Sequence, residues 1–139
     1  MDQRLDPWQL YFLGGVLLLP VVLVGGALVF EKMAFDRDVA LVTERRIDDL
    51  AKRLRDADGS DRLLQSYSLT FSVMGPPNAL SVAAARCDEE VVALFFELAG
   101  GKLQPEYIRD AQAYFELQPA ARQCPKVGEL LRRRVGTKG

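Results

Sequence analysis

The pattern of apolar and polar positions divides the chain near residue 31. Residues 7–30 carry no charged side chain, and Asp6 and Glu31 stand at the two ends of this stretch. As a helix, residues 8–30 would be about 34 Å long, against a bilayer hydrocarbon core of about 30 Å. Trp8 and Phe30 suit the aromatic belts at the two interfaces. The pattern predicts a transmembrane helix over residues 8–31, after a short flank of residues 1–7.

Glycines repeat within this predicted span. Gly14 and Gly15 recur as Gly25 and Gly26, and eleven residues are close to three helical turns. Both pairs therefore share one face, against which a second helix could pack closely. The alternative is that lipid simply tolerates these glycines. Pro20, between the pairs, is expected to kink the helix.

A cleaved signal peptide is the main alternative to an anchor. Such a peptide has a positively charged start and an apolar core of about 7–15 residues. This chain begins with Asp2, Arg4 and Asp6, and its apolar stretch is longer. Small residues at positions 25 and 26 would nevertheless permit cleavage there. The sequence favours a retained helix.

Residues 32–58 are predicted to continue out of the membrane as a juxtamembrane helix. Apolar or small residues recur at a spacing of three or four, and oppositely charged residues such as Arg45 and Asp49 lie four apart. This short seam fits a helix packed on its own domain, or a parallel coiled coil in a homo-oligomer. The seam consists of Ala40, Thr43, Ile47, Leu50, Leu54 and Ala57.

Residues 59–139 are predicted to form a small, mainly helical domain. Asn78 is placed to cap a helix over residues 79–98, and Pro105 and Pro125 to begin helices that reach about residues 117 and 135. In residues 67–73, apolar and polar side chains alternate, as in a half-buried strand. This strand would need a local hairpin or the sheet edge of another protein as its partner. The expected fold class is mainly α, with room for one short β-strand or hairpin.

Composition removes several kinds of chemistry. The chain has no histidine, which excludes Ser-His-Asp and Cys-His arrangements and the commonest transition-metal ligand. Its 18 Lys and Arg against 19 Asp and Glu lack the basic excess of a nucleic-acid binder. The cluster Arg132, Arg133 and Arg134 fits a solvated helix face, or contact with anionic lipid or an acidic partner. No cofactor or metal is expected.

Two clusters of reactive residue types give little further support to catalysis. Asp88, Glu89 and Glu90 are adjacent in a predicted helix, so their side chains diverge and a preformed cation site is not expected. A Ser–Lys dyad needs no histidine, but the serines at positions 66, 68 and 72 have Lys52 as the nearest lysine in sequence. The sequence also lacks a glycine-rich phosphate loop. We expect a protein that is not an enzyme.

The two cysteines and the charges that flank the predicted span indicate opposite sides of the membrane for the domain. Cys87 and Cys124 suggest a disulfide, which persists in an oxidising compartment; two buried thiols are the alternative. By contrast, Lys32 and Arg37 follow the span while Arg4 precedes it, and the positive-inside rule would keep the domain in the cytoplasm. That rule weakens for long translocated segments. We favour a periplasmic or extracellular domain on a single-pass protein of the cell inner membrane.

The layout of a short N-terminus, one span and a small two-cysteine domain is similar to that of envelope-complex subunits, phage lysis regulators and anchored immunity proteins. The expected function is that of an accessory or structural subunit of a cell-envelope complex. Its partners would be membrane lipid and other membrane or envelope proteins. A membrane-tethered module that captures or inhibits a soluble partner is the alternative. A small membrane-bound hydrolase is the weaker third hypothesis.

Overall fold

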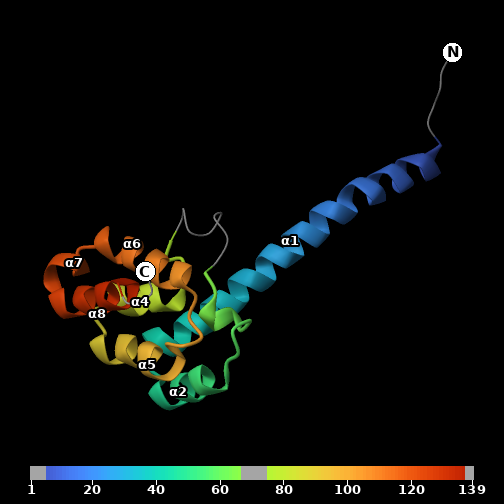
Figure 1. Ribbon diagram of the computed structural model, residues 1–139. Coiled ribbons are helices and arrows are strands. Elements are labelled where there is room, and N and C mark those ends of the chain that lie inside the picture. Colours follow the sequence, from blue (N-terminus) through green and yellow to red (C-terminus); the bar gives the residue numbers. More distant parts are fainter. Residues whose placement is uncertain (1–5, 67–74, 137–139) are drawn as a thin grey trace. The chain divides into compact units, whose positions relative to one another are not determined.

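The fold is helical, as the sequence predicts. A computed structural model of the chain describes residues 6–66 and 75–136, and all regular elements in those two stretches are helices (Figure 1). The chain divides into two compact units, Met1–Ala34 and Phe35–Gly139. The mainly α fold class is therefore confirmed. The strand or hairpin predicted for residues 67–73 lies outside the described residues.

The first helix, α1 (Pro7–Thr43), contains the whole predicted span. Pro7 occupies its first position, where a missing N–H costs nothing, and the carbonyl of Asp6 accepts from the backbone N–H of Gln9 at 2.8 Å. The helix runs continuously through Pro20. By length and composition, α1 is able to cross a membrane, and no other described helix meets that condition.

The predicted continuous helix through residue 58 is wrong. The chain turns after Thr43, and α2 (Ile47–Asp56) begins a separate helix. Arg45 adopts a φ of 51°, a left-handed conformation that ends α1 and is uncommon for a side chain other than glycine. The turn lets Leu50 and Leu54 become fully buried in the chain's own core. That burial agrees with packing on the same domain, the alternative to a coiled coil.

The predicted helix over residues 79–98 is also interrupted. The structure has α4 (Ala79–Ala85) and α5 (Glu89–Ala99), separated by a corner at which Cys87 has a φ of 58°. Asp88 then starts α5, because its side chain accepts from the backbone N–H of Val91 at 3.4 Å. A long uninterrupted helix was expected because helical periodicity alone does not reveal a left-handed residue.

Prolines mark the remaining helix starts. After the short 3-10 turn η1 (Arg62–Leu64), the later helices are α6 (Pro105–Glu116), α7 (Ala120–Gln123) and α8 (Pro125–Gly136). Pro105 and Pro125 begin their helices, as predicted. The short helix α7 was not anticipated.

One hydrophobic core holds these helices together. In Figure 1, α6 lies beside α4 and α8, and α2 packs against α5. The core receives side chains from every one of these helices and from the last turns of α1, through Val42. Its largest fully buried members are Tyr107, Phe95, Leu50, Leu54, Leu80, Ile108 and Leu131.

Cationic side chains complete the ends of two helices. The Lys102 ammonium donates to the carbonyls of Leu54 and Arg55, at 3.2 and 3.0 Å, at the end of α2. The Arg134 guanidinium donates to the Phe96 carbonyl at 3.3 Å and lies 5.1 Å from the centre of the Phe96 ring. Both contacts place positive charge at the negative end of a helix dipole. Arg134 thus joins α8 to α5.

Candidate functional site

The apolar part of α1 is bare. Among the described residues, the large hydrophobic side chains that are exposed all lie between Trp8 and Met33, with the single exception of Leu117. Trp8 and Phe12, for example, are 85% and 72% exposed. An apolar surface of this extent is costly in water, since burial of apolar area is favourable by about 25 cal/mol per Å². A helix of this length and exposure is compatible with a membrane anchor or with a signal sequence.

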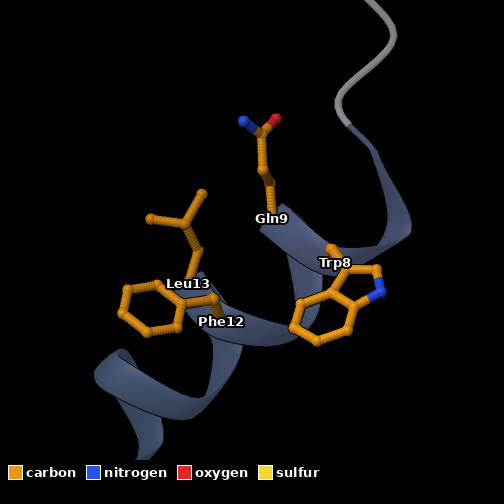
Figure 2. A pocket seen from close by; sticks show the side chains of 4 residues that line it. All are labelled: Trp8, Gln9, Phe12 and Leu13. Carbon is orange, nitrogen blue, oxygen red and sulfur yellow. The ribbon is translucent and has the colours of Figure 1, made fainter.

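A shallow apolar hollow lies near the start of α1. Figure 2 shows its lining, formed by Trp8, Gln9, Phe12 and Leu13. Residues 8 and 12, and residues 9 and 13, are each one helical turn apart, so the hollow is the groove between two rows of side chains on one helix. The lining has no ionisable group.

The predicted glycine face is unoccupied. A Cβ atom built on Gly14, Gly15, Gly25 or Gly26 would meet no other atom within 4 Å. The face is therefore open enough to admit a neighbouring helix, and its use for packing stays a prediction. Pro20 lies inside the continuous helix, and the predicted kink likewise stays a prediction.

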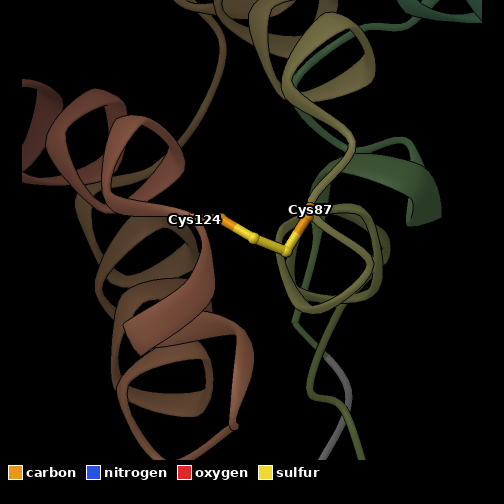
Figure 3. The surroundings of a disulfide bond; sticks show 2 residues. All are labelled: Cys87 and Cys124. Atoms are coloured by element: carbon orange, nitrogen blue, oxygen red, sulfur yellow. A yellow bond between two sulfur atoms is a disulfide. The ribbon is translucent and has the colours of Figure 1, made fainter.

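Cys87 and Cys124 form the disulfide that the sequence suggested. Their Cα atoms are 5.8 Å apart, within the usual range for a bridge, and the closed loop has a sequence separation of 37 (Figure 3). The bond joins the corner between α4 and α5 to the residue directly before α8. It therefore ties together parts of the domain distant in sequence. Disulfides are typical of proteins in oxidising compartments.

Ion pairs also hold the residues that follow this corner. The Arg45 Nε lies 3.1 Å from Asp88 Oδ2, and its Nη2 lies 2.6 Å from Glu90 Oε2. Arg45 and Cys87, which are the left-handed non-glycine residues of the described stretches, are thus held by an ion pair and a disulfide that lie close together in the sequence of α5 and its corner. The predicted pair of Arg45 with Asp49 is replaced, because Arg46 contacts Asp49 at 2.6 Å instead.

Within the acidic cluster, Asp88 has a structural role. Asp88 caps α5, and its side chain is 13% exposed beside Arg45, whereas Glu89 is exposed. The expected solvated face is therefore wrong for Asp88. Over residues 6–66 and 75–136, no group of three or more His, Cys, Asp or Glu side chains is arranged to hold a metal ion.

An ion triad with one buried member, which sequence reasoning missed, involves the last turns of α1. Asp38 is 2% exposed, and its Oδ1 lies 3.2 Å from Arg53 Nη1. Arg53 also contacts Asp61, through Nη2 at 2.9 Å and Nε at 3.3 Å. The only signal in the sequence was that Asp38 precedes the inward-facing Val42 by one helical turn.

The two carboxylates of the triad have opposite pKa shifts. Burial raises the pKa of Asp38 above its ordinary 3.8, and the charge of Arg53 only partly offsets this. Burial also acts to raise the pKa of Asp61. Hydrogen bonds from Arg53 and from the Leu63 backbone N–H, with the Arg53 charge, outweigh burial and lower it below 3.8. Asp61 therefore loses its proton more readily than an ordinary carboxyl group, and Asp38 loses it less readily.

Of the three serines weighed for catalysis, Ser66 is described, and positions 68 and 72 lie outside the described residues. The Ser66 hydroxyl accepts from Asn78 Nδ2 at 3.1 Å, and the same nitrogen donates to the Tyr107 carbonyl at 3.0 Å. Asn78 also caps α4 through a capping box with Ser81, as predicted for a cap. Ser66 thus belongs to a structural network, and Lys52 is exposed on α2.

The arginine cluster near the C-terminus is divided between two environments. Arg132 and Arg133 are exposed, and Arg133 pairs with Glu129 one turn earlier at 2.5 Å. Arg134 instead packs on Phe96. The solvated face expected for this cluster therefore applies to its first two members.

The chain was compared with protein-family models, with curated proteins and with solved structures, and none of the three comparisons found a match.

Proposed function

We propose that this chain is a single-span membrane protein in which α1 anchors a small disulfide-bonded helical domain on the periplasmic or extracellular side. The domain would serve as an accessory or structural subunit of a cell-envelope complex, without catalysis. The observation that carries this proposal is the contrast in exposure: the apolar side chains of residues 8–33 are bare, whereas those of the domain are buried in its own core. Membrane lipid is the first partner that this surface requires.

The length of α1 supports an anchor over a cleaved leader. The helix continues without interruption past Gly25 and Gly26 to Thr43, and its residues Asp38 and Val42 are buried. Intact-mass analysis of the protein extracted from membranes tests this step. Retention of residues 1–34 is expected, and a mature chain that begins after residue 26 would reject the anchor.

The disulfide supports the orientation. Thiol labelling of intact cells with a membrane-impermeant reagent should modify Cys87 and Cys124 only after an external reductant is added, because both are bridged. Labelling without reductant, and only after the cytoplasmic side is opened, would place the domain in the cytoplasm. That result would also favour the sidedness suggested by Lys32 and Arg37.

The glycine face supports a protein partner within the membrane. Photo-crosslinking residues placed at Gly14 or Gly25 should capture a specific neighbour, whereas Val16 and Ala27 on the opposite face should capture it much less. The substitution Gly25→Leu should reduce co-purification of that neighbour, and Ala27→Leu is the matched control. Equal capture from both faces would show that lipid alone surrounds α1.

A tethered binding module is the second candidate, favoured by the compactness of residues Phe35–Gly139. Replacement of residues 8–30 by an unrelated single-span helix distinguishes the two. A module that needs only a tether would keep its partner after the exchange, whereas a subunit recognised through its span would lose it.

A further inference from the structure

The attachment of α1 to the domain core depends on very few side chains. Of the described residues of this helix, only Asp38 and Val42 are buried, and they are one turn apart. Val39 and Leu41 pack against the core while partly exposed. One of the two buried side chains in the last turns of α1 is therefore a carboxylate. Its protonation state must affect how firmly those turns are held.

The ionised form of Asp38 is poorly compensated. Among the described residues, its buried Oδ2 has no hydrogen-bond partner, and its Oδ1 lies 3.2 Å from Arg53 Nη1. A carboxylate can accept about four hydrogen bonds, and burying one without them costs free energy. The neutral acid loses most of this cost, since it carries no charge.

Arg53 makes two hydrogen bonds with Asp61, besides its contact with Asp38. It contacts both oxygens of Asp61, at 2.9 and 3.3 Å, and so forms a bidentate pair with that carboxylate. The charged groups that act on Asp38 are Arg53 of α2, Asp61 before η1 and Arg37 of α1 itself. One arginine thus serves two carboxylates, and Asp38 receives the smaller share.

We propose that Asp38 is a proton-operated latch: uptake of a proton removes a charge that is costly to bury and so tightens the packing of the last two turns of α1 on the domain core, and loss of the proton loosens it. The latch goes beyond the function proposed above and does not depend on it.

The direction in which pH changes the folding stability follows from the two pKa shifts. Because the pKa of Asp38 is raised above 3.8 in the folded domain, its contribution to stability is fully present below 3.8 and is lost as pH rises through the folded pKa. Asp61 acts in the opposite direction: its pKa is lowered, so its contribution is present above 3.8 and is lost as pH falls through its folded pKa. The two effects occupy different pH ranges and can be separated.

Hydrogen exchange on the full chain in detergent micelles tests the latch. From about pH 7 to about pH 4, the exchange protection of the backbone amides of residues 39–43 should rise several-fold relative to those of α6. Asp38→Asn should remove this pH dependence, whereas Asp36→Asn, on an exposed position of the same helix, should keep it. Unchanged or falling protection in the native chain, or persistence of the effect in Asp38→Asn, would overturn the proposal.

A second measurement does not require any variant. The ¹³C chemical shift of the Asp38 carboxyl in the native chain should titrate with a midpoint above the ordinary 3.8. A midpoint at or below that value would reject the latch even if Asp38→Asn failed to fold.

Discussion

Large apolar side chains are exposed in the first part of α1 and buried in the domain that follows. Between Trp8 and Met33 large apolar side chains are exposed, whereas from Val42 onward Leu, Val and Phe side chains enter a shared core. The regions differ in composition, because residues 7–30 carry no charged side chain whereas the helices of the domain carry many. The first region is therefore apolar on all sides, and the helices of the domain are apolar on one side. The core of a domain this small cannot surround a helix that is apolar on all sides.

Truncation of a phenylalanine should change the unfolding free energy of the domain in one region and not in the other. Phe95→Ala should destabilise the domain by about 3–5 kcal/mol, because Phe95 is fully buried and leaves a cavity. Phe12→Ala, at a 72% exposed position of α1, should leave domain unfolding unchanged. Denaturant unfolding of the full chain in micelles, followed through domain signals, measures both. Equal losses would show that the first region also packs on the domain.

Loss of the disulfide should destabilise the domain and leave the apolar part of α1 unaffected. Replacing both Cys87 and Cys124 by Ala should lower the free energy of unfolding by about 3–4 kcal/mol, as expected for a loop of this length. Membrane extraction should not change, since the bond lies outside residues 8–30. Thermal unfolding with and without reductant is the measurement. An unaltered Tm would mean that the core alone fixes the corner at Cys87.

A charge placed in the first region should act on insertion rather than on folding. Leu19→Arg puts a guanidinium near the middle of the predicted span and should make insertion less favourable by about 2.5–3.5 kcal/mol. The membrane-integrated fraction after alkaline extraction reports this loss. Leu117→Arg is the matched control, because Leu117 is 84% exposed in the domain. If both variants integrated like the native chain, α1 would not be the anchor.

A smaller effect is expected at the polar centre of the domain. Asn78 is fully buried, caps α4 and donates to Ser66 and to Tyr107. Asn78→Ala should therefore cost about 1–3 kcal/mol in unfolding free energy. Gln65→Ala, at an exposed position, is the control. A cost no greater than that of the control would mean that the network contributes nothing.

The smallest effect should come from the surface of α8. Arg133→Ala removes a pair with Glu129 in which both side chains are more than half exposed. Exposed pairs one turn apart stabilise a helix by about 0.2–0.5 kcal/mol, and salt screens them. Unfolding at low and high salt should show a loss that nearly vanishes with salt. A larger, salt-independent loss would indicate a role in packing.

Local signals in the sequence predicted much of the domain. Asn78 as a cap, and Pro105 and Pro125 as helix starts, act within one or two turns of the chain, and all three were read correctly. The corners at Arg45 and Cys87 were missed. A left-handed residue other than glycine is held by contacts distant in sequence, here Arg45 with Asp88 and Cys87 with Cys124, and periodicity does not register them.

In the candidate site, too, some features could be predicted from the sequence and others could not. The apolar helix, its glycine positions and the cysteine pair were visible as residue types at fixed spacings. The triad of Asp38, Arg53 and Asp61 was not, since its members come from two helices and a loop and meet only after folding.

By itself, the sequence determined that this protein has one uninterrupted apolar helix and a domain of amphipathic helices bounded by prolines. These properties depend on neighbours within a few residues. Only the tertiary structure decided where the helices break, which carboxylate is buried, and which arginine is shared. Those outcomes depend on desolvation and on charge pairs formed between distant segments, and burial of a charge has no signature in the order of residues alone.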